Sequence, residues 1–464
     1  MLKIHNSLTK TKDLFTPQKK SLIRMYTCGV TVYDDCHIGH ARSLYVFEII
    51  RRYLKYRGYK VQFIRNITDI DDKIINRAKE LGVDWKELVN KYIESYYQDL
   101  ETLGISKADK EPRATENVGD MIKYIEKLID KEYAYVIESG VYFSVRKFKD
   151  YGKLSGQSID KMKEGVRISK VESKEDPLDF ALWKKAKEGE PSWESPWGMG
   201  RPGWHIECSV MSQKYLKTDT LDIHGGGRDL IFPHHENECA QAEALTGKVF
   251  ANYWIHHGLL TINSQKMAKS LGNFVTIQDA VSKYSADILK IFYLQAHYSS
   301  SVDFSEKKME EAKKAYQRIQ IFMNRIGLIK KAKVTKEAQE LLEQFRNKFI
   351  EAMDDDFNMP KGLAVLFDII NVSNKILDIE GNSKAKVAGI GGLVEEILDI
   401  FGISLKPIET AEISAKDIEK LIKLRTELKQ QKKYQEADGI RKKLEEQGII
   451  LEDTKDGTTY RSKL

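Results

Sequence analysis

Two histidines, His37 and His40, stand three residues apart where a strand-like segment gives way to apolar residues at helical spacing. Residues three apart project from the same side of a helical turn, and the first turn carries unpaired N–H groups with partial positive charge. Two imidazoles at that point suit a phosphate whose negative charge grows in a transition state. Gly39 between them would let a nucleotide approach the backbone. An equally good interpretation is two ordinary histidines at the start of a helix.

Two lysines, Lys266 and Lys269, also stand three residues apart, far downstream in a polar loop with the sequence KMAKSLGN. A mobile loop with two lysines can bring positive charge to a departing pyrophosphate as negative charge moves onto it. Taken alone, a loop of this kind is more often a solvated surface feature.

Two cysteines, a histidine and a glutamate offer a set of metal ligands. His234 and Glu238 lie four residues apart at a predicted helix start and share one face, whereas the neighbouring His235 is expected to point elsewhere. Cys28 precedes the histidine pair, and Cys208 ends the segment GWHIEC. Two thiolates, an imidazole and a carboxylate would make a zinc site. The alternatives are a surface hydrogen bond for the histidine and glutamate, and two buried thiols that never meet.

A glycine run, DIHGGGRD, stands between a predicted strand and a predicted helix. Glycines allow close approach of a nucleotide to the backbone. A single run of this kind is weak evidence for a nucleotide site.

The elements that must position these residues are also visible. Residues 24 to 34 and 61 to 70 have strand composition, and the segment between them has the spacing of a helix that stops near Gly58. Strand, helix and strand in this order predict a parallel βαβ unit. We expect an open α/β sheet with a ligand crevice at the carboxyl ends of its strands.

The rest of the chain changes character twice. Tyr151 to Gly203 is rich in glycine, proline and tryptophan and is interpreted as an insertion with irregular loops. From about Ser305, long helices rich in lysine and glutamate predict a helical bundle. A last unit, from near Gly402, has a helix and then a hairpin pattern that turns at Asp456 and Gly457.

Composition sets the class of protein. The 464 residues predict two to four domains, and 41% hydrophobic with 31% charged residues is typical of a soluble globular chain. No apolar run is long enough to span a membrane, and no secretory signal is visible, so the cytoplasm is expected. A net charge of +6 permits a nucleic-acid partner without requiring one. Of the four cysteines, Cys36 and Cys239 are predicted to be packing residues.

Together these motifs resemble the class I aminoacyl-tRNA synthetases. The segment HIGH matches that family's sequence of the same name, and KMAKS matches its KMSKS loop, with Ala268 in place of the usual serine. The resemblance sharpens to the cysteinyl-tRNA synthetases. The matching segments are YTCGVTVYDDCHIGHARS, FIRNITDIDDKII, SPWGMGRPGWHIECSVM, DIHGGGRDLIFPHHENECAQ, KMAKSLGNF and EADGIRKKLEEQGIILED, in the family's order over nearly the whole chain.

The resemblance implies an α/β fold with a Rossmann-type parallel-sheet catalytic domain that carries an insertion. A helical bundle and a small C-terminal α+β anticodon-binding unit would follow. The expected domains are residues 1–114 and 200–255 (catalytic), 115–199 (connective insertion), 256–304 (KMSKS-containing stem-contact region), 305–400 (helical bundle) and 401–464 (anticodon binding).

The resemblance also implies roles for individual residues. The zinc ligands would be Cys28, Cys208, His234 and Glu238. The cysteine pocket would be lined by Thr68, Trp204 and His224. The residues that assist activation would be His37, His40, Lys266 and Lys269, with Lys269 also contacting ATP. The floor of the adenylate site would be formed by Gly225, Gly226, Gly227 and Asp229.

The activity implied is that of a cysteinyl-tRNA synthetase, which activates L-cysteine with ATP and Mg²⁺ and transfers it to the 3′ end of tRNA(Cys). One Zn²⁺ per chain would select the thiol, and the chain is expected to be a cytoplasmic monomer that binds no membrane. Asn76 stands where relatives often have lysine, which argues against a lysine-dependent persulfide activity. Two alternatives are a ligase that joins cysteine to a small-molecule amine and a regulator without catalysis. The terminal unit argues against the first, and the intact motifs argue against the second.

Overall fold

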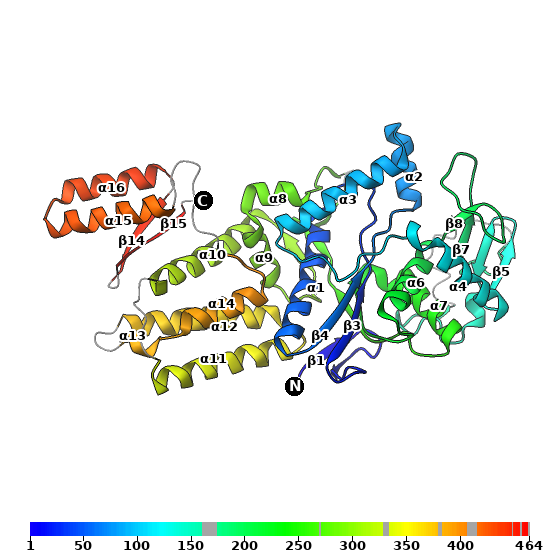
Figure 1. Ribbon diagram of the computed structural model, residues 1–464, viewed down its shortest axis with the longest axis horizontal. Coiled ribbons are helices and arrows are strands. Elements are labelled where there is room, and N and C mark those ends of the chain that lie inside the picture. The colour runs from blue at the N-terminus through cyan, green and yellow to red at the C-terminus, as the bar shows by residue number, and fades with distance from the viewer. Residues whose placement is uncertain are drawn as a thin grey trace. The chain divides into compact units, whose positions relative to one another are not determined.

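The chain forms two compact units (Figure 1). The computed structural model describes residues 1–159, 174–268, 271–327, 334–378, 383–405, 415–447, 449–454 and 457–462. The first unit comprises Met1–Ser282, Tyr298–Asp303 and Asp354–Phe357, and the second comprises Lys283–His297, Phe304–Met353 and Asn358–Leu464. Within the described ranges, no helix is both long and apolar enough to cross a membrane.

A four-stranded parallel sheet with the order β10-β9-β3-β4 lies at the centre of the first unit. Its strands are β3 (Leu22–Thr27), β4 (Lys60–Arg65), β9 (Leu221–Gly227) and β10 (Ala251–His257). Helix α1 (Ile38–Tyr56) connects β3 to its neighbour β4, so the predicted βαβ unit and Rossmann-type sheet are confirmed. The helix stops just before Gly58, whose φ of 86° suits glycine.

Both strands of the βαβ unit are shorter than predicted, because strand composition continues to residues 34 and 70 while the ladder does not. At Gly29, an added Cβ would lie 1.5 Å from the main-chain oxygen of Asn66. Beyond this close approach the segments continue only as an isolated bridge between Thr31 and Thr68, with main-chain bonds from Thr68 to Val30 (3.1 Å) and from Val32 to Thr68 (3.2 Å). Residue composition does not reveal where a ladder stops, since the β-branched residues beyond it, such as Val32 and Ile67, are buried like those within it.

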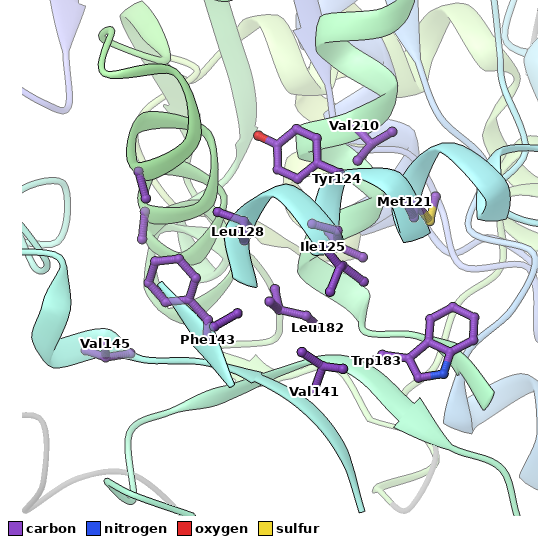
Figure 2. Close-up of a cluster of buried hydrophobic side chains, with 14 of the residues drawn as sticks. Met121, Tyr124, Ile125, Leu128, Val141, Phe143, Val145, Leu182, Trp183 and Val210 are labelled. Atoms are coloured by element: carbon purple, nitrogen blue, oxygen red, sulfur yellow. The ribbon is translucent and has the colours of Figure 1, made fainter. Parts of the chain in front are cut away.

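A second sheet occupies the region predicted as an insertion. It is antiparallel, with strands β5 (Ala134–Ile137), β6 (Gly140–Phe143), β7 (Phe180–Lys185) and β8 (Gly200–Pro202) in sequential order. Helix α4 (Val118–Asp130) packs in this hydrophobic core through one stripe, composed of Met121, Tyr124, Ile125 and Leu128. Figure 2 shows the stripe facing Val141, Leu182 and Trp183 of the strands. Burial of each such side chain stabilises the core by roughly 1.5–3 kcal/mol.

Further elements flank these sheets. They are β1 (Lys3–Asn6), β2 (Thr11–Leu14), α2 (Asp72–Leu81), α3 (Trp85–Thr102), α6 (Trp204–Leu216), α7 (Glu236–Thr246), β11 (Leu260–Ile262), β12 (Gln265–Lys266), α8 (Ile277–Tyr284) and β13 (Val302–Phe304). Helices α6 and α7 pack against each other. This pairing brings two segments with candidate metal ligands together.

Helices dominate the second unit, as predicted from about residue 305. They are α9 (Ala286–Leu294), α10 (Glu306–Gly327), α11 (Lys336–Asp354), α12 (Met359–Leu377), α13 (Ser383–Lys386), α14 (Ile390–Ile400), α15 (Ala415–Gln430) and α16 (Tyr434–Glu446). A terminal hairpin, β14 (Ile449–Thr454) and β15 (Gly457–Ser462), shares a small core with α15 and α16. The predicted last helix and hairpin are confirmed, although Asp456 of the predicted turn lies outside the described residues. The five predicted domain boundaries stay predictions.

Candidate active site

The two histidines at the start of α1 cap the helix and each other. The Nδ1 atom of His37 accepts the main-chain N–H groups of Gly39 (3.1 Å) and His40 (3.3 Å). In return, Nδ1 of His40 accepts the main-chain N–H of His37 at 3.3 Å. Their rings stack with centroids 3.7 Å apart. The expectation that both side chains project together is therefore confirmed.

This capping fixes what the two imidazoles can do. Burial lowers the pKa of His37 to about 4 and that of His40 to about 3, so both rings are neutral at pH 7. Because each Nδ1 accepts a main-chain N–H, the single ring proton lies on Nε2. The site thus offers two neutral N–H donors rather than two positive charges.

The lysine loop lies against the same helix start. The main-chain N–H of Ile38 donates to Val275 (3.1 Å), and that of Ile277 donates to Cys36 (3.0 Å). On the other side of the loop, the methyl of Met267 lies 3.6 Å from the position a Cβ of Gly39 would take. The exposed Lys266 ends β12, and Lys269 lies outside the described residues.

A further residue of the loop, Asn273, was not assigned a role from the sequence. Its Oδ1 accepts the main-chain N–H of Ala268 at 2.8 Å, and its Nδ2 donates to the carbonyl of Lys266 at 3.1 Å. The side chain therefore closes the loop across its base. Its position as the last residue of the KMAKSLGN motif was the one feature of the sequence that could have indicated this role.

Four candidate metal ligands from three separate segments come together at the carboxyl end of the sheet. The donor atoms of Cys28, Cys208, His234 and Glu238 all lie within 4.8 Å of one another. The two sulfurs are 3.6 Å apart, and Cys208 Sγ is 3.5 Å from Nε2 of His234. The same nitrogen is 3.0 Å from Oε1 of Glu238. Three of the four are buried, whereas Cys28 is half-buried.

The charges of these groups are coupled. Burial opposes ionisation of the Cys208 thiol, but hydrogen bonds with Cys28 and His234 lower its pKa to about 6. Burial also opposes the imidazolium of His234, yet Glu238 and Cys208 raise its pKa to about 10. Burial and the Cys208 sulfur raise the pKa of Cys28 well above its ordinary value. One thiolate forms readily here, and a second requires additional positive charge, which a metal ion provides.

The prediction that His235 points elsewhere is wrong. Its Nε2 lies 3.3 Å from Cys28 Sγ and 4.0 Å from Oε1 of Glu238. The segment Ile231–His235 is a π-type turn in which Phe232 is extended, and α7 begins only at Glu236. Regular helical spacing therefore does not apply across it. A second possible ligand group results, composed of Cys28, His224, His235 and Glu238.

Comparison with known proteins places this chain in a family. Residues 14–314 match the model of the class I (C) tRNA synthetase catalytic domain, and residues 348–406 match the DALR domain. The protein of Persephonella marina named cysteine–tRNA ligase is 48% identical, and the match covers 100% of both chains. The chain belongs to the cysteinyl-tRNA synthetase family. The cysteine–tRNA ligase of Halalkalibacterium halodurans is 49% identical over 99% of each chain.

Solved structures of other synthetases share the fold. Methionyl-tRNA synthetase of Mycobacterium tuberculosis aligns with a TM-score of 0.63 and 15% identity over 82% of this chain and 90% of its own. The LeuRS of Agrobacterium radiobacter aligns with a TM-score of 0.64 and 11% identity over 84% of each chain. At these identities the likeness shows a common fold and nothing about substrate.

Histidines that were not predicted surround the ligand cluster of this cysteinyl-tRNA synthetase family member. His205 Nδ1 is 2.9 Å from Nδ1 of His234. His256 Nε2 is 2.8 Å from Nδ1 of His235, and its other nitrogen is 2.7 Å from Oγ of Ser7. Partners of this kind hold a ligand ring in one orientation. Nothing in the spacing of His205 or His256 marks them, because the tertiary packing alone makes them neighbours.

The predicted cysteine-pocket residues occupy three different places around the cluster. The Trp204 ring stacks on His234 with centroids 4.1 Å apart. Thr68 is buried, with its hydroxyl 2.8 Å from the carboxylate of Glu207. His224 is fully buried, and its Nε2 is 2.8 Å from Oε2 of Glu238. His224 therefore contacts a predicted metal ligand directly.

The glycine run lies inside β9 and not, as predicted, between a strand and a helix. A Cβ on Gly225 would lie 2.2 Å from the Phe47 ring, and one on Gly226 would lie 2.6 Å from Cε1 of His235. Any larger residue at these two positions would therefore clash with a neighbouring ring of the protein itself. A Cβ on Gly227 would meet the carboxylate of the exposed Asp229 at 2.4 Å.

The remaining cysteines stand apart from both ligand groups. Cys36 and Cys239 are buried and contribute to neither, as their prediction as packing residues requires.

Proposed function

We propose that the protein is a cytoplasmic, ATP-dependent cysteine–tRNA ligase. It converts L-cysteine and ATP to cysteinyl-adenylate and pyrophosphate and then transfers the cysteine to the 3′ end of tRNA(Cys). The observation that carries the proposal is the gathering of two thiols, an imidazole and a carboxylate at the end of strand β3, the strand that leads to the capped start of α1. Cysteine–tRNA ligases that match the chain over its whole length support it.

We propose Cys28, Cys208, His234 and Glu238 as ligands of one zinc ion. Two sulfurs, one nitrogen and one oxygen within 4.8 Å are a donor set that zinc accepts, and the readily ionised Cys208 suits a soft cation. The second possible ligand group, which contains His224 and His235, has a single sulfur and is therefore less suited to zinc. When bound, zinc supplies affinity for a thiolate, which serine cannot match because its hydroxyl keeps its proton near neutral pH. A pocket that relied on size would hardly reject serine.

Activation follows from the donors at the helix start. The carboxylate of cysteine attacks the α-phosphate of ATP, and the Nε2–H groups of His37 and His40 donate to oxygens on which charge accumulates. Lys266 and Lys269, with Mg²⁺, neutralise the departing pyrophosphate. Trp204 and Thr68 line the cysteine pocket next to the cluster, His224 supports Glu238, and Gly227 and Asp229 border the adenylate.

The terminal unit is proposed to hold the anticodon. Tyr434 is 59% exposed at the start of α16 and is available to stack on an unpaired base. A second tyrosine of the unit, Tyr460, packs against its small core and is less available for stacking. We propose that the protein acts as a monomer.

Two assays test the proposal in sequence. Cysteine-dependent exchange of pyrophosphate into ATP is expected, with serine giving no measurable exchange. Absence of exchange in the zinc-loaded protein would show a regulator instead. Charging of tRNA(Cys) with cysteine is expected next. Exchange without charging would identify a ligase for a small-molecule amine.

A further inference from the structure

Arg42 is a cation on the helix that carries the two histidines, and no part of the activation scheme above uses it. Its side chain is 1% exposed. It lies two residues after His40, which places it about 200° around the helix axis. The histidines and Arg42 therefore leave α1 on opposite sides.

The guanidinium of Arg42 binds four main-chain carbonyls from two segments. Nη1 donates to Gly258 and Leu259, each at 2.8 Å. Nη2 donates to Tyr298 at 3.2 Å and also to Ser300. A planar group with several fixed donors can satisfy carbonyls from two directions, whereas a lysine ammonium is a point charge at the end of a flexible stem.

The two segments approach each other closely at this point. A Cβ on Gly258 would lie 2.3 Å from the carbonyl carbon of Ser300 and 2.6 Å from the nitrogen of Ser301. The main-chain N–H of Gly258 donates to Tyr298 at 2.9 Å, and that of Val302 donates to Leu259 at 3.0 Å. Four carbonyls consequently converge on one cation.

The position of this cluster in the chain connects it to the lysine loop. Gly258 and Leu259 are the two residues between β10 and β11, and β11 pairs with β12, which ends at Lys266. The far side of the loop is attached to the start of α1 by two main-chain hydrogen bonds, in which Val275 accepts from Ile38 and Cys36 accepts from Ile277. Arg42 thus attaches the near side of the loop to the same helix.

We propose that Arg42 is a positioning residue for adenylate formation: it sets the separation between the histidine donors of α1 and Lys266. The inference rests on the proposed function. Charge stabilisation of the leaving group depends on that separation, and a misplacement of about 1 Å can lower a rate by about 100-fold. Zinc and cysteine bind elsewhere, so their affinities do not depend on it.

Two substitutions in the full-length, zinc-loaded protein test this. Arg42→Lys keeps the charge and loses the planar fork, and Gly258→Ala leaves Arg42 intact but forces the Ser300 segment away. Both are expected to lower kcat of cysteine-dependent ATP–pyrophosphate exchange by about 10- to 100-fold, with KM for cysteine and zinc content within twofold of wild type. Arg52→Lys is the matched control, because Arg52 lies on the same helix and pairs with Glu48 instead.

The outcomes are separable. Wild-type kcat in both variants, or a parallel loss of zinc and cysteine affinity, would overturn the positioning role. Melting temperatures identify a variant that fails to fold, in which case the other variant decides. A wild-type protein without exchange would contradict the proposed function itself. An active wild type with an equally active Arg42→Lys and Gly258→Ala would contradict only the inference about Arg42.

Discussion

The sulfurs of Cys28 and Cys208 lie 3.6 Å apart, although 180 residues separate them in the chain. Cys28 directly follows strand β3, and Cys208 lies in the second turn of helix α6. The parallel sheet and the helix packed against its carboxyl end bring them together. Alone, Cys208 is an ordinary buried cysteine and Cys28 a half-buried one, whereas together they are a soft ligand set.

Loss of one thiol of this pair should remove both metal and selectivity. Cys208→Ser is expected to lower zinc content below one-tenth of wild type and to raise KM for cysteine at least about 100-fold, because a structural zinc ligand contributes several kcal/mol. Metal analysis and pyrophosphate exchange measure the two effects. Cys239→Ser, one turn from Glu243, is the control and should retain zinc. Full zinc content and an unchanged KM for cysteine in Cys208→Ser would contradict the assignment of Cys208 as a zinc ligand.

The capped histidines predict a loss of stability in acid. An unfolded histidine binds a proton at a pKa of 6.5, but folded His40 does so only near pH 3, so the unfolded state holds more protons between these values. Stability present above pH 6.5 is therefore lost as the pH falls. From pH 7.5 to 5.0 the loss for this group is about 2 kcal/mol at most. Thermal unfolding at both pH values should show a smaller loss in His40→Asn, and equal losses would contradict the assignment.

Gly226 is expected to affect zinc affinity, because it leaves room for the ring of His235. Gly226→Ala places a methyl 2.6 Å from Cε1 of that ring and displaces it from Cys28. Loss of such an outer contact lowers zinc affinity about 10- to 100-fold, which a chelator competition measures. Gly119→Ala is the matched control, because its Cβ meets nothing within 4 Å and helix α4 gains up to about 1 kcal/mol from alanine. Wild-type zinc affinity in the Gly226 variant would show that His235 plays no supporting part.

Asn273 should keep the lysine loop closed. Asn273→Ala removes two hydrogen bonds across the base of the loop, so trypsin should cleave after Lys266 faster and kcat of exchange should fall about tenfold or more. Zinc content should not change. Gln265→Ala, at an exposed neighbouring position, serves as the comparison. If trypsin cleaves both variants at the same rate and their kcat values are equal, the closed form of the loop does not depend on Asn273.

Local signals were sufficient for much of the fold. The apolar period from Ile38 onward predicted α1, and similar periods predicted the long helices beyond Ser305 and the last helix with its hairpin. These are short-range features, because backbone hydrogen bonding and the burial of one face are decided within a few turns. Strand ends were not predictable, since the approach of Gly29 to Asn66 involves residues far apart in the chain.

The sequence by itself determined the residue types at the site, the βαβ order that positions them and the family to which they point. Tertiary structure alone decided that His235 turns toward Cys28 and that only a glycine at position 226 leaves room for its ring. It also decided that Arg42 attaches α1 to the segment that leads into the lysine loop. The physical reason is that periodicity describes one element at a time. Which side chains meet between elements depends on packing at the carboxyl ends of the strands, where regular periodicity stops.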